Sequence, residues 1–225
     1  YHLFVVDLYG LVSVLLTSRN RNVPKPIKNA LGRAREFIGS FGACPDDLPL
    51  IGDSDSGFAL SRFLRLSWTN ALEHKSGLTR FHDAGYSIVR ADAAGSIELI
   101  LDHGALGMPP SFGHGHADAL SLVLRIAGKT LLTDPGTYTY TGNPLWRTYF
   151  RSTRAHNTVN VDGFDQSRQD SAFLWSKPFR AELVDTVRQP SGETRFLMRH
   201  HGYQDIGVTH WRCVIVAASG VIQVM

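Results

Sequence analysis

The sequence predicts an α+β protein in which helices are followed by a large antiparallel β-sandwich. Before about residue 75, apolar residues recur at three- and four-residue spacing, which is typical of helices. After residue 76, short β-rich segments recur at roughly 8 to 15 residue spacing with turn signals between them, as in an antiparallel sandwich. We therefore expect two domains, residues 1–75 and residues 76–225.

Three helices are expected in the first domain. The first covers residues 3–16, where apolar residues recur at mixed three- and four-residue spacing. The second runs from Ile27 to Phe41 and follows Pro24 and Pro26, which suit the start of a helix. A loop rich in Pro, Asp and Gly, residues 42–57, leads to a third and weaker helix at residues 58–72.

The strands of the second domain are predicted from apolar and β-branched runs bounded by turn residues. Ala127-Gly128 is typical of a tight hairpin turn between two of them. The expected strands cover residues 81–90, 96–102, 120–126, 129–133, 158–161, 179–187, 194–200 and 210–216.

Composition sets limits on the class of protein. The chain is 43% hydrophobic, enough for a core, and its net charge of +3 is compatible with an anionic partner but too small to indicate nucleic acid. No apolar run reaches the ~18 residues of a membrane span. Cys44 and Cys213 lie far apart, so no disulfide framework is expected. Because the chain begins at Tyr1 and ends directly after an apolar run, we expect a fragment of a longer protein.

The chemistry is concentrated between residues 113 and 162. Imidazoles and carboxylates are typical ligands of divalent metals, and this segment holds His114, His116, Asp118, Asp134 and His156. His114 and His116 would face the same side of a strand, or Gly113 and Gly115 would let a loop bring them together. The alternative is a set of separate, hydrogen-bonded histidines.

Aromatic and basic residues are interleaved between Asp134 and His156. They are Tyr138, Tyr140, Trp146, Arg147, Tyr149, Arg151 and Arg154. Rings can pack on sugar faces and guanidinium groups can pair with carboxylate or sulfate, so Trp146 and the three arginines are candidates for binding an acidic glycan. A packed loop with solvated arginines would have the same composition.

Two runs, HGHADALSLVLRIAGKTLLTDPGTYTY and YFRSTRAHNTVNVDGFDQS, resemble the heparinase II/III family of polysaccharide lyases, alginate lyases included. The run GDSDSGF, Gly52 to Phe58, is similar to the family's connection out of its toroid. The opening Tyr1-His2-Leu3-Phe4 is similar to the start of the helix that carries a catalytic tyrosine. The resemblance implies that residues 1–75 end an incomplete α/α toroid, and that the following antiparallel β-sandwich is truncated at its C-terminal end.

The resemblance also implies a function. Such lyases cleave uronic-acid-containing acidic polysaccharides, such as glycosaminoglycans or alginate, by β-elimination. It implies a structural Zn²⁺ held by His116, Asp134 and His156, an active-site histidine at His114, a base or acid at Tyr1, and a supporting tyrosine at Tyr138 or Tyr149. It implies a periplasmic or secreted location as well. Since most of the toroid is absent, the fragment is expected to be inactive by itself.

Two other functions remain open from the residues. One is a non-catalytic glycan-binding protein, or an accessory protein of exopolysaccharide biosynthesis, with the same sandwich and metal. The other is a metal hydrolase that uses a zinc-bound water, for which Asp118 is the candidate general base.

Overall fold

The computed structural model describes residues 2–42, 47–54, 76–92 and 95–225, which fall into two compact units. One unit comprises Tyr1–Pro49 and Ser54–His74, and the other comprises Leu50–Asp53 and Lys75–Met225. The short segment Leu50–Asp53 thus belongs with the strands, although the sequence places it in a loop between helices. This assignment matters because Asp53 contacts the candidate site.

The first unit contains two of the expected helices, α1 (His2–Ser18) and α2 (Lys25–Gly39). A proline in the first turn of α2 needs no backbone hydrogen bond, which explains why the helix begins beside Pro24 and Pro26. The ring of Phe37 contacts those of His2 and Phe41, at centroid distances of 5.0 and 4.8 Å. The third expected helix, residues 58–72, lies outside the described residues. Within the described part of the chain, no helix is long and apolar enough to cross a bilayer.

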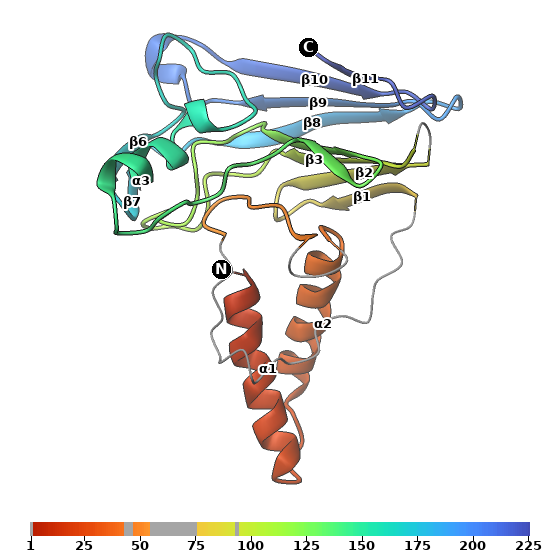
Figure 1. Cartoon of the computed structure of the whole chain (residues 1–225), viewed down its shortest axis with the longest axis vertical. Coiled ribbons are helices and arrows are strands. Elements are labelled where there is room, and N and C mark those ends of the chain that lie inside the picture. Colours follow the sequence, from red (N-terminus) through yellow and green to blue (C-terminus); the bar gives the residue numbers. More distant parts are fainter. Residues whose placement is uncertain (1, 43–46, 55–75, 93–94) are drawn as a thin grey trace. The chain divides into compact units, whose positions relative to one another are not determined.

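The second unit is built on two antiparallel sheets that lie face to face (Figure 1). The first sheet has the strand order β1-β2-β3-β4-β5, from β1 (Gly77–Phe81), β2 (Tyr86–Ala91), β3 (Ile97–Asp102), β4 (Leu122–Ile126) and β5 (Lys129–Leu132). The second has the order β11-β10-β9-β8, from β8 (Ala181–Arg188), β9 (Thr194–His200), β10 (His210–Val216) and β11 (Ile222–Val224). This arrangement confirms helices followed by antiparallel sheets.

The core of this unit lies between the sheets. Along β9 the buried side chains are every second residue, because successive side chains of a strand point to opposite faces. The cluster combines both sheets and consists of Val89, Leu99, Leu101, Leu120, Leu122, Phe196, Met198, Val214 and Val216. Each such buried side chain contributes about 1.5–3 kcal/mol of hydrophobic stabilisation. The sheets therefore form a rigid base for the loops at their edges.

The hairpin turn at Ala127-Gly128 is confirmed, since both residues have positive φ, as a tight two-residue turn requires. The strand expected at residues 158–161 is wrong: that stretch forms only an isolated bridge between Val161 and Phe164. Its polar side chains bind neighbouring loops instead, as when Thr158 Oγ1 donates to Ala119 O at 2.7 Å.

Three elements near the site were not predicted from the sequence. They are helix α3 (Pro144–Arg151) and the paired strands β6 (Arg168–Ser171) and β7 (Leu174–Ser176). Helix α3 begins with a proline in its first turn, and the Asn143 side chain accepts hydrogen bonds from Leu145 N and Trp146 N. These are helix-start signals, but the helix has only eight residues, too few for a clear apolar period.

Candidate active site and metal centre

His114 and His116 lie on a loop rather than on a strand, so of the two arrangements that the sequence allowed, the glycine-dependent one holds. A Cβ on Gly115 would lie 1.8 Å from Leu106 O, and one on Gly113 would lie 2.6 Å from Phe173 O. No side chain fits at these distances, so both glycines are required by close backbone packing.

Three hydrogen bonds from distant segments hold this loop. Ala117 N donates to Arg151 O at 2.9 Å, which ties the loop to the end of α3. Ala119 N donates to Gln166 Oε1 at 2.8 Å, and Gln166 Nε2 donates back to Ala119 O at 3.1 Å. The backbone that directly follows His116 is therefore held in place.

His156 lies beside His116, although it comes from a later segment of the chain. It follows the short helix η3 (Thr153–Ala155), where its backbone N–H donates to Thr153 O. The next residue, Asn157, donates through Nδ2 to Leu122 O at 3.0 Å and to Thr133 O at 2.8 Å. The start of β4 and the residue directly after β5 thereby position the segment of His156 through the Asn157 side chain.

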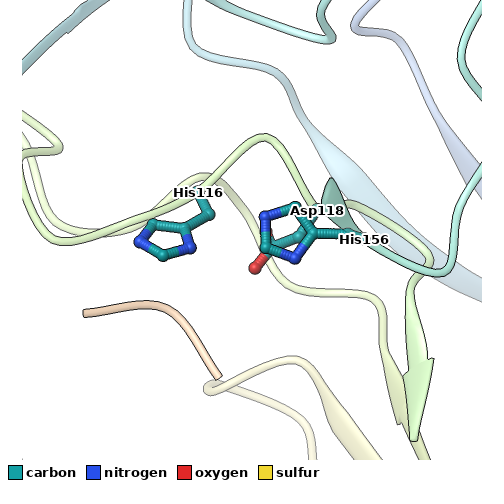
Figure 2. A group of neighbouring side chains, drawn as sticks. All are labelled: His116, Asp118 and His156. Carbon is teal, nitrogen blue, oxygen red and sulfur yellow. The ribbon is translucent and has the colours of Figure 1, made fainter. Parts of the chain in front are cut away.

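His116, Asp118 and His156 form a buried group whose ligand atoms all lie within 4.8 Å of one another (Figure 2). Within the described residues, His116 Nδ1 and His156 Nε2 have no hydrogen-bond partner, although both atoms are buried. Buried ring nitrogens without partners are costly, and a cation between them would satisfy both. Two imidazoles and a carboxylate suit Zn²⁺ in particular.

Asp134 lies beside His156 and bonds to its ring. The Nδ1 atom of His156 bonds to Asp134 Oδ2 at 2.9 Å, so the carboxylate contacts the ring nitrogen opposite the unpartnered one. Its other oxygen accepts from Gly136 N at 3.0 Å. A carboxylate behind a histidine fixes the ring's orientation and tautomer. The structure thus brings His116 and His156 together, with Asp118 beside them and Asp134 behind His156.

The electrostatics of this group favour a cation. Burial raises the pKa of Asp118 to about 7, and the neighbouring charge of Asp134 adds to the effect. Burial, together with the charge of Asp118, also raises the pKa of Asp102 well above its usual range. Burial alone would lower the pKa of His156, but its bond to Asp134 outweighs that and raises it. A divalent ion would compensate such crowded carboxylates.

A second buried carboxylate, that of Asp53, contacts both histidines of the loop. Its Oδ1 atom bonds to His116 Nε2 at 3.0 Å, and its Oδ2 atom bonds to His114 Nδ1 at 3.1 Å. Arg147 donates to both oxygens, and Thr137 Oγ1 donates to Oδ1 at 3.0 Å. Burial would raise the pKa of Asp53, but the bonds from His116 and Arg147 hold it well below its usual range. Sequence reasoning missed Asp53, although it lies in the GDSDSGF run.

Arg147 and Arg151, expected to bind the glycan, are buried on the inner side of α3. Besides Asp53, Arg147 donates to Ala172 O at 2.9 Å, and Arg151 donates to Ser171 O at 2.9 Å. The Arg151 guanidinium also lies 4.5 Å from the centre of the Trp175 ring. Their exposed fractions are 1% and 0%. This placement favours positioning of the loops over direct contact with a glycan.

The other expected site residues within the described ranges are exposed. Tyr138, Trp146 and Tyr149 form an aromatic group with Phe150, in which neighbouring ring centroids lie 5.1 to 5.9 Å apart. The Arg154 side chain is exposed too, and the His114 side chain is 48% exposed. Tyr1 lies outside the described residues. The exposed candidates thus include aromatic rings, two phenols and an imidazole.

Known protein families include one that matches most of this chain. The family model for the heparinase II/III-like C-terminal domain matches residues 73–223. No match was found among curated proteins. Similar solved structures include a heparinase III (17% identity, TM-score 0.75), a heparinase III gene product (16%, 0.74) and a heparan sulfate lyase from Pedobacter heparinus (18%, 0.71).

Each of these structures covers 100% of this chain, whereas the chain spans only 36% to 38% of their length. At such identities the structural likeness shows a shared fold. The family model covers well over half of the chain, including the histidine loop, α3 and His156. The chain therefore belongs to the heparinase II/III-like family through its C-terminal domain.

Proposed function

We propose that this chain forms part of a polysaccharide lyase that cleaves a uronic-acid-containing acidic polysaccharide by β-elimination. Family membership supports this activity, since similar structures bear the names of heparinases and heparan sulfate lyases. The observation that carries the proposal is the position of His114: a half-exposed imidazole lies two residues from a buried His/Asp/His group and shares a carboxylate with it.

The chemistry requires a base, an acid and a group that neutralises the uronate carboxylate. The C5 proton is removed, the bond from C4 to the leaving oxygen breaks, a C4=C5 double bond forms, and the leaving oxygen takes up a proton. An imidazole exchanges protons near neutral pH, so His114 suits one of these transfers. The phenols of Tyr138 and Tyr149, and that of Tyr1, are the other candidates. Trp146 and Arg154 are exposed candidates for substrate contact.

The buried group is proposed as a zinc site. His116 and His156 would each supply a ring nitrogen. The family resemblance gives Asp134 as the carboxylate ligand, and in this structure Asp134 bonds to His156 Nδ1. Asp118 competes for that role, because its ligand atom lies within 4.8 Å of those of both histidines. The ion would chiefly hold together the loop of His116 and the segment of His156. It would thereby keep the loop that carries His114 in place.

Metal analysis of purified variants tests the zinc site. We expect His116→Gln and His156→Gln to lose the ion, and Asp134→Asn to weaken binding about 10–100-fold. Asp185→Asn, an exposed aspartate of β8, is the matched control. Full retention in Asp134→Asn together with loss in Asp118→Asn would assign the carboxylate role to Asp118. Absence of zinc or a similar ion from the wild-type protein would overturn the site.

The activity is tested with the full reading frame, because the chain spans 36% to 38% of the lyase structures. Elimination creates an unsaturated uronate, so ultraviolet absorbance should rise when the protein acts on alginate, heparan sulfate or related glycans. Because we propose a periplasmic or secreted location, the protein is prepared from that fraction. No rise on a broad panel would refute the lyase proposal. Retention on a glycan column without cleavage would instead support a glycan-binding or biosynthetic accessory role, and saturated products would support a metal hydrolase.

A further inference from the structure

The buried carboxylate of Asp53 connects the exposed His114 to the buried group of His116, Asp118 and His156. It receives bonds from His114, His116, Thr137 and Arg147, and it is only 4% exposed. Arg147 is itself buried and uses two different nitrogens for the two oxygens of Asp53. Such a bidentate pair holds the carboxylate in one orientation and keeps it ionised.

An ionised carboxylate can only accept hydrogen bonds, so both histidine nitrogens that face Asp53 must donate. His116 therefore carries its proton on Nε2, which leaves the lone pair on Nδ1. His114 carries its proton on Nδ1, which leaves the lone pair on Nε2. In a neutral imidazole each ring has one donor and one acceptor, so a single carboxylate sets the tautomers of both rings.

The two lone pairs match the two tasks of the site. His116 Nδ1 is one of the buried nitrogens without a hydrogen-bond partner in the described part of the chain, and it belongs to the ring that lies beside Asp118 and His156. The ring of His114 is 48% exposed, so its Nε2 atom belongs to a side chain that a substrate can reach. The opposite tautomers would place protons on the metal-facing nitrogen and on the basic one.

We infer that Asp53 is a positioning residue that fixes the tautomers of His114 and His116 and thereby links the metal site to proton transfer at the substrate. The tautomer assignment stands on the contacts alone, while its effect on catalysis rests on the proposed lyase function. Arg147 and Thr137 orient the carboxylate for this purpose. The alternative is that the Asp53–Arg147 pair only stabilises the fold. In that case the tautomers of His114 and His116 would not depend on Asp53.

The tautomers are measured directly on this chain. Long-range ¹H–¹⁵N spectra of protein labelled with ¹⁵N-histidine distinguish Nδ1–H from Nε2–H, and His114→Gln and His116→Gln assign the two signals. We expect Nδ1–H on His114 and Nε2–H on His116, in zinc-free and zinc-loaded protein alike. The opposite tautomer on either assigned ring in the wild-type chain would overturn the inference.

Asp53→Asn supplies the second arm, because its amide presents one acceptor and one donor where two acceptors stood. We expect at least one histidine to change tautomer, with about 10–100-fold weaker zinc binding if that ring is His116. In the full reading frame, a change at His114 should lower kcat about 10²-fold while KM changes less than about twofold.

Glu98→Gln is the matched control, since Glu98 also accepts from two arginines, Arg90 and Arg125, but lies on β3 away from these histidines. It should leave the tautomers, the zinc content and kcat unchanged. Unchanged tautomers in a folded Asp53→Asn variant would show a merely structural pair and refute the inference. If no glycan is cleaved by wild type, the lyase proposal fails, but the spectra still decide the tautomers.

Discussion

A pair of histidines on β9 and β10 should make the sandwich sensitive to acid. His200 on β9 is fully buried and bonds through Nε2 to Nδ1 of His210 on β10, at 2.9 Å. Its own Nδ1 accepts from Gly202 N at 3.0 Å. Both ring nitrogens are therefore occupied in the neutral form, and a further proton on Nδ1 would break the bond to Gly202.

Burial lowers the pKa of His200 from 6.5 to about 3, and the nearby His210, His201 and Arg212 act in the same direction. The rings of Phe179 and Tyr203 cover the remaining sides, at centroid distances of 6.2 and 5.3 Å. Since the folded pKa lies below the unfolded one, the unfolded chain binds the proton first. The contribution to stability is present above about pH 6.5 and is lost progressively as the pH falls toward 3.

The magnitude follows from the width of that interval. At about pH 5 the unfolded histidine is protonated and the folded one is not, so about 1.5 pH units at about 1.4 kcal/mol each give a loss near 2 kcal/mol. For a unit of this size the loss corresponds to a fall in Tm of about 4–8 °C. The other buried ionisable groups add their own pH dependence, so the test compares variants.

Urea unfolding at about pH 7.5 and about pH 5 measures the effect in the wild type, in His200→Gln and in His82→Gln. Glutamine has no charged form, so His200→Gln should show about 2 kcal/mol less loss of stability between the two pH values than the wild type. His82 is exposed in the turn after β1, and its variant should follow the wild type. Equal pH dependence in the wild type and His200→Gln would refute the reasoning.

Three further predictions concern stability and are read from thermal or urea unfolding. Gly115→Ala should cost more than about 3 kcal/mol, because its Cβ would lie 1.8 Å from Leu106 O; a loss below 1 kcal/mol would show that the loop can move away. Leu99→Ala should cost about 2–5 kcal/mol by opening a cavity between the sheets, while an unchanged midpoint would contradict the packing. Asn143→Ala should cost about 1 kcal/mol by removing the cap of α3, and an unchanged midpoint would contradict the capping role of its side chain.

Much of the fold could be predicted from the sequence, because the signals are local. The strands at residues 194–200 and 210–216 agree with β9 and β10, since alternating burial along one face leaves a period of two in the sequence. Helix α3 has only eight residues, and the stretch after His156 is shaped by side-chain bonds to neighbouring loops, so neither has a periodic pattern.

The sequence by itself determined the residue types of the site: the glycines that let the histidine loop pack closely, and the histidines and aspartates that suit a metal and proton transfer. Only the tertiary structure decided how these residues divide the work. It placed Asp118 beside His116 and His156, Asp134 behind His156, and Arg147 and Arg151 in the interior. It also brought in Asp53, 63 residues away from His116 along the chain. Hydrogen bonds between such distant segments depend on how the loops pack, and no spacing in the sequence records them.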